Sequence, residues 1–358
     1  QGGTITSVTA DKPLLPGALR QGTALPGMAN LHSHAFQRGM AGLSERRGET
    51  TDSFWSWRQI MYGFNDHLTP DHVEAIAALV YAEMLEAGFT SVGEFHYLHH
   101  DRDGSPFNDR AEMAGRICAA AEKTGIALTL LPVFYRHAGF GDAVASNGQR
   151  RFLHDPDGYA DLIAASRRHV ETLDNAALGI APHSLRAASH TDIETILPLA
   201  EDGPVHIHIA EQVKEVADCE AALGARPVAH LLDTQPVDAR WCLVHATHMT
   251  HDETAALARS GAVAGLCPLT EANLGDGIFP AQDFLAADGA IGIGSDSHIR
   301  IDLAEEIRLL EYGQRLTSRQ RNVLARSGES TGRRLFEASL AGGARALAQP
   351  TGRIEAGA

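Results

Sequence analysis

The chain has 358 residues, enough for one large α/β barrel with a small appendage or for two medium domains. Its apolar fraction of 44% and charged fraction of 21% are those of an ordinary globular protein, and no apolar run approaches the length of a membrane span. A formal net charge of -15 argues against a nucleic-acid partner, because phosphate binding needs a basic surface, so we expect a small-molecule substrate and no membrane partner.

The two ends of the chain lie outside the pattern that follows. Residues 2–8 predict a strand and a turn, and residues 352–357 predict a turn that leads into a further strand. We therefore expect residues 1–24 and 349–358 to be the remnants of a small flanking β-sandwich domain. Residues 25–348 then form the main domain.

From residue 25 onward, short runs rich in Val, Ile and Leu alternate with amphipathic stretches. This alternation is typical of strand and helix units repeated around a parallel sheet. Eight strands are predicted, at residues 25–33, 91–97, 126–134, 177–183, 205–210, 241–246, 262–267 and 290–295. Eight units favour a (β/α)8 barrel of the TIM type, although the pattern alone leaves an open sheet as an alternative.

Two segments lie between the first two predicted strands. Residues 43–67 are long for a strand-to-helix connection and rich in aromatic residues, and long loops at this face of a barrel are usually functional. Thr69 and Pro70 then predict the start of a helix, because threonine caps helices and proline suits their first turn. That helix is expected to run to Leu85 and to end at Gly88.

Polar residues close several of the predicted strands, and in such a barrel the active site lies at the C-terminal strand ends. The first strand closes on His32 and His34, which alternate along the strand and so face the same way. Strands five, six and eight also end in residues of the types that bind metal ions, and Glu211 follows the fifth strand. These residues are His208, Glu211, His245 and Asp296.

Three imidazoles and a carboxylate suit Zn2+ or Fe2+ and leave room for a water molecule. A bound divalent ion lowers the pKa of water to about 7, which supplies a nucleophile at neutral pH. We predict that one ion is held by His32, His34, His208 and Asp296. Glu211 is placed to move protons between the water and a leaving nitrogen, and His245 to stabilise charge on the attacked group.

Each of these residues has a structural alternative. An HxH pair on a strand is often structural when it stands alone, and Glu211 could be a carboxylate stabilised at a helix N-terminus. His206 lies one alternation before His208 and is either a buried supporting residue or part of the site. Because residues of metal-binding types occur at several strand ends together, the metal site is favoured over the structural alternatives.

The run at residues 26–34, together with His208, Glu211, His245 and Ser295-Asp296, resembles the amidohydrolase superfamily over essentially the whole barrel. Strand four ends in residues 181–184 without a lysine, so the carbamylated lysine that bridges two metals in some members has no candidate. The resemblance therefore implies a mononuclear site, as deaminases use.

Finer motifs are similar to the family of N-formimino-L-glutamate deiminases of bacterial histidine degradation. They lie at residues 34–39, 93–97, 181–186, 266–277, 295–298 and 305–315. That family hydrolyses the formimino C=N bond to give N-formyl-L-glutamate and ammonia. The resemblance implies a zinc enzyme that works as a homodimer.

The resemblance also implies roles for individual residues. It assigns the zinc to His32, His34, His208 and Asp296, and proton handling to Glu211 and His245 with Asp296 beside them. Arg186 can pair with one substrate carboxylate, and Arg58 is the candidate for the other. The remaining substrate-facing residues are Gln37, Tyr97 and His183.

Two other functions stay open at this point. A deaminase of the same superfamily that acts on an aromatic base or a triazine would need a stacking pocket and no carboxylate clamp, which Arg186 disfavours. A catalytically dead barrel used as a binding protein would be expected to have lost part of the ligand set, which is intact here.

The four cysteines form no CxxC pair and lie in apolar or helical stretches. We expect them to be reduced core residues. With no secretory signal recognised ahead of the first element, a cytoplasmic location is expected.

Overall fold

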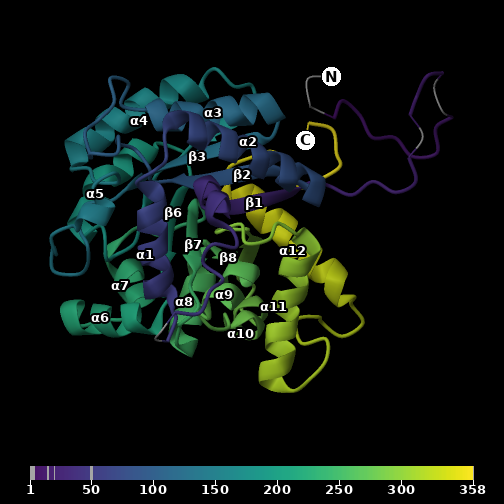
Figure 1. Ribbon diagram of the computed structural model, residues 1–358. Helices are drawn as coiled ribbons and strands as arrows, with labels where there is room; N and C mark the ends of the chain where they lie inside the picture. Colours follow the sequence, from purple (N-terminus) through teal and green to yellow (C-terminus); the bar gives the residue numbers. More distant parts are fainter. Residues whose placement is uncertain (1–4, 14–15, 20, 49–50, 358) are drawn as a thin grey trace.

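The computed structural model describes residues 5–13, 16–19, 21–48 and 51–357. Its strands form one parallel sheet curled into a barrel, with helices around it (Figure 1), as the sequence predicts. The sheet order is β4-β3-β2-β1-β9-β8-β7-β6, and β5 pairs with β3. The strands are β1 Met28–Ser33, β2 Phe89–His96, β3 Ala127–Phe134, β4 Ala176–Leu178, β5 Ala181–Pro182, β6 Val205–Ile209, β7 Trp241–His245, β8 Val263–Leu266 and β9 Ala290–Ile293.

The fourth predicted strand is divided into β4 and β5, and this break closes the barrel. Between them, the backbone N–H of Ile180 donates to Pro204 O at 3.0 Å, and Ile180 O accepts from the N–H of His206 at 3.1 Å. Gly179 permits the approach, because a Cβ there would lie 2.4 Å from Pro204 O. The segment can therefore pair with β3 on one side and with β6 on the other.

Twelve α-helices surround the barrel in the part of the chain that the structure describes. They are α1 Phe54–Asn65, α2 Pro70–Ala87, α3 Glu112–Thr124, α4 Pro156–Val170, α5 His190–Ile196, α6 Val213–Leu223, α7 Pro227–Thr234, α8 His251–Ser260, α9 Pro268–Leu274, α10 Ala281–Ala286, α11 Leu303–Ser318 and α12 Thr331–Ala346. The predicted start of α2 is confirmed, since the Thr69 side chain accepts from the backbone N–H of His72, and Gly88 ends the helix with φ +96°.

The aromatic segment at residues 43–67 is not a loop throughout. Residues Phe54–Asn65 form helix α1, whose more buried face carries Arg58, Met61, Tyr62 and Asn65 at helical spacing. The prediction missed this helix because aromatic residues occur on several of its sides, which hides the apolar stripe.

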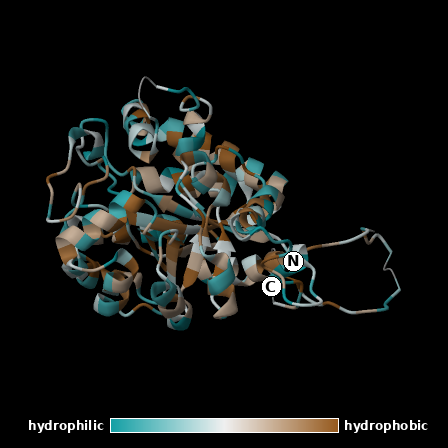
Figure 2. Cartoon of the chain, turned by 90° about the horizontal axis from the view of Figure 1, so that it is seen from below, coloured by the Kyte–Doolittle hydropathy of each residue, from teal (hydrophilic) through white to brown (hydrophobic). Residues whose placement is uncertain are grey.

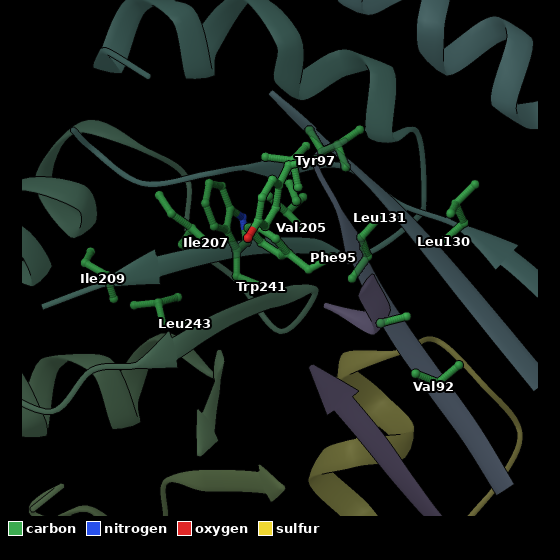
Figure 3. Packing of buried hydrophobic residues seen from close by; sticks show 14 of the residues in the cluster. Val92, Phe95, Tyr97, Leu130, Leu131, Val205, Ile207, Ile209, Trp241 and Leu243 are labelled. Atoms are coloured by element: carbon green, nitrogen blue, oxygen red, sulfur yellow. The ribbon is translucent and has the colours of Figure 1, made fainter. Parts of the chain in front are cut away.

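The apolar core lies between the strands and the surrounding helices. Along β6, Val205, Ile207 and Ile209 alternate with His206 and His208, so one face of the strand is apolar and the other carries imidazoles. Figure 3 shows Val205, Ile207 and Ile209 with the neighbouring residues of β2, β3 and β7 that complete this packing. Hydrophobic residues gather on the central strands, while the helices show hydrophilic residues outward (Figure 2).

The last helix closes the N-terminal end of the barrel. Gly342 of α12 approaches β9 so closely that a Cβ would lie 1.9 Å from Ile291 O. Ala346 O accepts from the His206 ring at 2.7 Å, and Leu347 O accepts from the Thr129 hydroxyl at 2.7 Å. His206 is therefore a buried supporting residue that joins β6 to the end of α12.

The described residues before β1 extend away from the barrel (Figure 1), whereas the segment after α12 begins against it, where Gln349 Nε2 donates to Leu128 O at 3.2 Å. In their described residues there is no strand, and one backbone hydrogen bond joins them, from the N–H of Gly357 to Ile5 O at 2.9 Å. The small β domain formed by both ends stays a prediction, and residues 1–4, 14–15, 20 and 358 of it lie outside the described residues.

Two simpler expectations can be compared with the structure directly. All four cysteines are buried and free. Among the described helices, none is both long and apolar enough to cross a membrane.

Candidate active site

Four ligand atoms converge at the C-terminal ends of β1, β6 and β9. The Nε2 atom of His32 lies 3.2 Å from Nε2 of His34 and 3.0 Å from Nε2 of His208. Asp296 Oδ1 lies 3.3 Å from His34 Nε2 and 3.6 Å from His32 Nε2. Ligands placed about 2.0–2.1 Å from one tetrahedral ion are about 3.3 Å from each other. Each of these four separations is therefore close to that between two ligands of a single ion.

In His34 and His208, the hydrogen bond of the second ring nitrogen prepares the first one for a cation. His34 Nδ1 lies 2.9 Å from Phe95 O, and His208 Nδ1 lies 3.1 Å from His183 O. A ring that donates through Nδ1 leaves a lone pair on Nε2, so lone pairs face one another in the site. Burial lowers the pKa of His34 to about 3 and holds the pKa of His32 and His208 well below the ordinary value. Protonation of these rings is therefore disfavoured, and their lone pairs stay free to bind a metal ion. A divalent ion satisfies this arrangement.

The backbone fixes the first strand to the last at this point. The N–H of Asp296 donates to His32 O at 3.0 Å, and the N–H of His34 donates to Asp296 O at 3.1 Å. Asp296 follows β9 with φ +47°, a left-handed conformation that non-glycine residues adopt at a cost. This turn aims its carboxylate at the histidines.

Glu94 supports the His32-Ser33-His34 segment from β2. Its Oε2 accepts from the hydroxyls of Ser33 at 2.6 Å and Tyr81 at 3.1 Å, and its Oε1 accepts from the N–H of Ala35 at 2.8 Å. Burial raises the pKa of Glu94 to about 7 against the opposing effect of these donors. The sequence motif around Glu94 was recognised, but its role was not predicted.

His245 lies among carboxylates on the other side of the ligand cluster. Its Nδ1 is 3.2 Å from Glu271 Oε1, and its Nε2 is 3.9 Å from Glu211 Oε1 and 3.8 Å from Asp296 Oδ2. Burial alone would lower the pKa of His245, but Glu211, Glu271 and Asp296 outweigh it and raise the pKa to about 10. The ring is therefore positioned as a cation beside the ligand cluster.

Glu211 is held by a residue that sequence reasoning missed. Its backbone N–H donates to Glu215 Oε2 at 3.0 Å, and Glu215 Oε1 lies 3.7 Å from Arg186 Nε. Both Glu215 and Arg186 are buried. Glu215 therefore contacts the proposed proton carrier through one oxygen and faces the predicted carboxylate-binding arginine with the other.

One cavity contains all the predicted substrate-facing residues. Gln37, Arg58, Tyr97, His183 and Arg186 line it together with His34, His208, Glu211, His245 and Asp296. Helix α1 covers one side of this cavity with Trp57, Arg58, Met61 and Tyr62. The structure thus brings the predicted residues together around one cavity.

Hydrogen bonds connect the polar side chains that line the cavity. Arg58 donates to the hydroxyls of Tyr62 and, at 3.2 Å, Tyr135. Gln37 donates to the Tyr97 hydroxyl at 2.8 Å. Tyr135 directly follows β3 and could have been found by the same strand-end rule that pointed to the histidines.

Comparison with known proteins gives the family. The model described as "Amidohydrolase family" matches residues 23–358. The chain belongs to the amidohydrolase family.

This amidohydrolase is 56% identical over 344 residues to the formimidoylglutamate deiminase of Pseudomonas aeruginosa, an alignment that covers 95% of this chain and 76% of that protein. A crystal structure of an amidohydrolase from Brucella melitensis matches with a TM-score of 0.97 and 56% identity, over 100% of this chain and 80% of that one. An adenosine deaminase from Xanthomonas campestris, solved with bound zinc, shares the fold at a TM-score of 0.74 and 23% identity, over 93% of this chain and 70% of that chain.

Proposed function

We infer that this amidohydrolase hydrolyses N-formimino-L-glutamate to N-formyl-L-glutamate and ammonia. The observation that carries the inference is its 56% identity, over 95% of the chain, to a formimidoylglutamate deiminase. The cavity supports it, because it combines a candidate metal centre with two arginines suited to a dicarboxylate.

We propose that the ion is zinc, one per chain, held by His32, His34, His208 and Asp296, with Fe2+ as the other ion that this ligand set suits. Such an ion lowers the pKa of water to about 7 and so supplies hydroxide at neutral pH. The spacing of the Nε2 atoms and Asp296 Oδ1, between 3.0 and 3.6 Å, supports this assignment.

Proton transfer is assigned to Glu211. Its carboxylate accepts a proton from the attacking water, and the new C–O bond converts the formimino carbon to a tetrahedral centre. Glu211 returns that proton to the nitrogen and then transfers the proton of the new hydroxyl group to the same nitrogen, so that the C–N bond breaks as the C=O bond forms and ammonia leaves. General acid and base steps of this kind contribute about 10² to 10⁴ in rate.

His245 is assigned to charge stabilisation beside the reacting carbon. Its interaction with Glu271 fixes the ring and favours the protonated form, so that Nε2 can donate a proton in a hydrogen bond. Asp296 acts with it, because its second oxygen, Oδ2, faces His245.

Arg186 and Arg58 are assigned to the two substrate carboxylates. The guanidinium groups lie 5.9 and 5.7 Å from the Trp55 ring, so one indole adjoins both. Gln37, Tyr97 and His183 complete the contacts from the barrel side. Because a carboxylate pairs with the planar guanidinium at two points, the arginines select for a dicarboxylate.

The test is release of ammonia from N-formimino-L-glutamate by zinc-loaded protein, with Glu211→Gln and Arg186→Met measured beside it. We expect release by the wild type, loss of turnover in Glu211→Gln, and about 10²-fold lower kcat/KM in Arg186→Met, which lacks a charge-assisted hydrogen bond. No release by folded, zinc-loaded protein would overturn the substrate.

One observation favours a second candidate function. Aromatic side chains of Trp57, Tyr62, Tyr135 and Phe152 line the cavity and could stack on a flat ring. Adenosine and a triazine therefore belong in the same ammonia assay. Turnover of either one in place of the dicarboxylate would identify an aromatic-base or triazine deaminase. The dead-barrel alternative predicts no turnover of any of the three.

We also propose that the enzyme is a cytoplasmic homodimer. The family resemblance is the support for the dimer, and four reduced, buried cysteines fit a reducing compartment. Light scattering during size-exclusion chromatography tests the dimer, and a mass of one chain would contradict it.

A further inference from the structure

Cys267 is a buried thiol beside the metal centre that the proposed mechanism does not use. It directly follows β8, at the strand end where the reacting groups meet. Ligand atoms of Cys267, His245 and Asp296 lie within 4.8 Å of one another, and all three residues are buried. This trio is separate from the three-histidine cluster and shares only Asp296 with the proposed ion site.

Asp296 presents a different oxygen to each place. Its Oδ1 lies 3.3 Å from His34 Nε2, whereas its Oδ2 lies 3.8 Å from His245 Nε2. A carboxylate in this position can bridge two cations, as carboxylates do in two-metal sites with ions about 3.5–4 Å apart. Glu211 Oε1, 3.9 Å from His245 Nε2, is close enough to supply a further oxygen.

The charge around His245 favours a cation. Four buried carboxylates, those of Glu211, Glu271, Asp276 and Asp296, surround or adjoin this one imidazole. Buried carboxylates are usually paired with a cationic side chain or bound to a metal ion. A thiol among them selects for ions that prefer sulfur, such as Cd2+ and Zn2+, over Mg2+ or Ca2+.

We propose that Cys267, His245 and Asp296 form a second cation site whose occupation inhibits the enzyme. The incoming ion replaces two protons: the S–H bond of Cys267 and the Nε2–H bond of His245 break, sulfur–metal and nitrogen–metal bonds form, and both protons leave to solvent. His245 and Asp296 Oδ2 are then tied to the ion and are lost to the reaction. The inference rests on the proposed single-ion centre, which stays occupied.

The experiment titrates protein loaded with one zinc per chain with Cd2+, and counts both metals after equilibrium dialysis. The wild type is expected to keep its zinc and to gain one cadmium, with a cadmium–thiolate band in the near-ultraviolet. Activity should fall about 10²-fold, the share of a proton-handling residue. Cys267→Ser is expected to gain neither the cadmium nor the band, and to keep its own starting activity when Cd2+ is added.

Cys118→Ser is the matched control, because Cys118 is also a buried free thiol but lies on α3, outside the trio. It should behave as the wild type does. Cadmium that replaces zinc one for one, or that binds equally to Cys267→Ser, would overturn the proposal. Because metal counts and absorbance need no turnover, the result is readable even if N-formimino-L-glutamate proves not to be the substrate.

Discussion

At the scale of single residues, the site depends on carboxylates that contact no predicted ligand atom directly. Glu271 orients His245, and Glu215 links Glu211 to Arg186. Glu94 holds the Ser33 hydroxyl and the Ala35 backbone N–H on either side of His34. Each is buried and accepts a backbone N–H, which fixes its position before substrate binds. Rigid placement of the reacting groups is what these residues add.

Glu215 offers a test of this positioning. Glu215→Gln keeps an oxygen for the N–H of Glu211 but removes the charge that faces Arg186, whereas Glu215→Ala removes both. Loss of one partner of a buried pair costs about 3 kcal/mol, so chemical denaturation should show lower stability for both variants. Only Glu215→Ala should also lose kcat, by about tenfold, because Glu211 is no longer held. Unchanged kcat in Glu215→Ala would show that Glu211 does not depend on this contact.

The sequence was enough to predict which four residues meet at the candidate ion site, but not these supports. His32, His34, His208 and Asp296 follow from one rule, that polar residues closing parallel strands meet at one barrel end. Glu215 and Glu271 lie in the helical segments after strands, where a glutamate is ordinarily a solvated surface residue. Their burial depends on packing against distant segments, which no local pattern records.

At the scale of elements, the barrel and the places of its strands along the chain were predictable, and two departures have physical causes. The fourth strand divides at Gly179 because it must pair with β3 and also reach β6. Helix α1 was missed because its aromatic residues face the cavity as well as the core. Both departures occur where an element serves two neighbours at once.

Contact of α12 with the barrel gives a prediction at this scale. Gly342→Ala would place a Cβ 1.9 Å from Ile291 O, so the helix must move away from β9. We expect the free energy of unfolding to fall by about 3 kcal/mol, as for other overpacked sites. Gly332→Ala, on the same helix but in open space, should change stability little or raise it by up to about 1 kcal/mol. Equal stability of the two variants in urea would contradict close packing at Gly342.

At the scale of the whole molecule, the chain is acidic, but three cationic side chains lie close together near the cavity. The formal net charge is -15, yet Arg58, Arg186 and Lys214 all lie within 6.0 Å of the Trp55 ring near the cavity. These positive charges attract an anionic substrate to the cavity, whereas the net negative charge of the molecule repels it elsewhere.

The predicted ion should also contribute to global stability. Three strand ends contribute ligands, so an ion bound only to the folded chain stabilises it by about 4 kcal/mol at a free concentration a thousand times Kd. A chelator should therefore lower the melting temperature of the wild type by several degrees. Asp296→Asn, which loses a ligand, should melt at nearly the same temperature with or without chelator. A chelator effect of equal size in both would contradict ion binding at this place.

The position of α12 has a consequence for how the molecule is made. Strand β1 leaves the ribosome early, but its partner β9 and the helix that closes the barrel beneath both follow some 260 residues or more later. Until then β1 has one open edge, and the end of the barrel has no cover. Such late, long-range contacts are slow to form and leave strand edges exposed in the meantime. The growing chain therefore holds an incomplete sheet while the residues between β1 and β9 are made, and its yield in the cell should depend on protection during that interval.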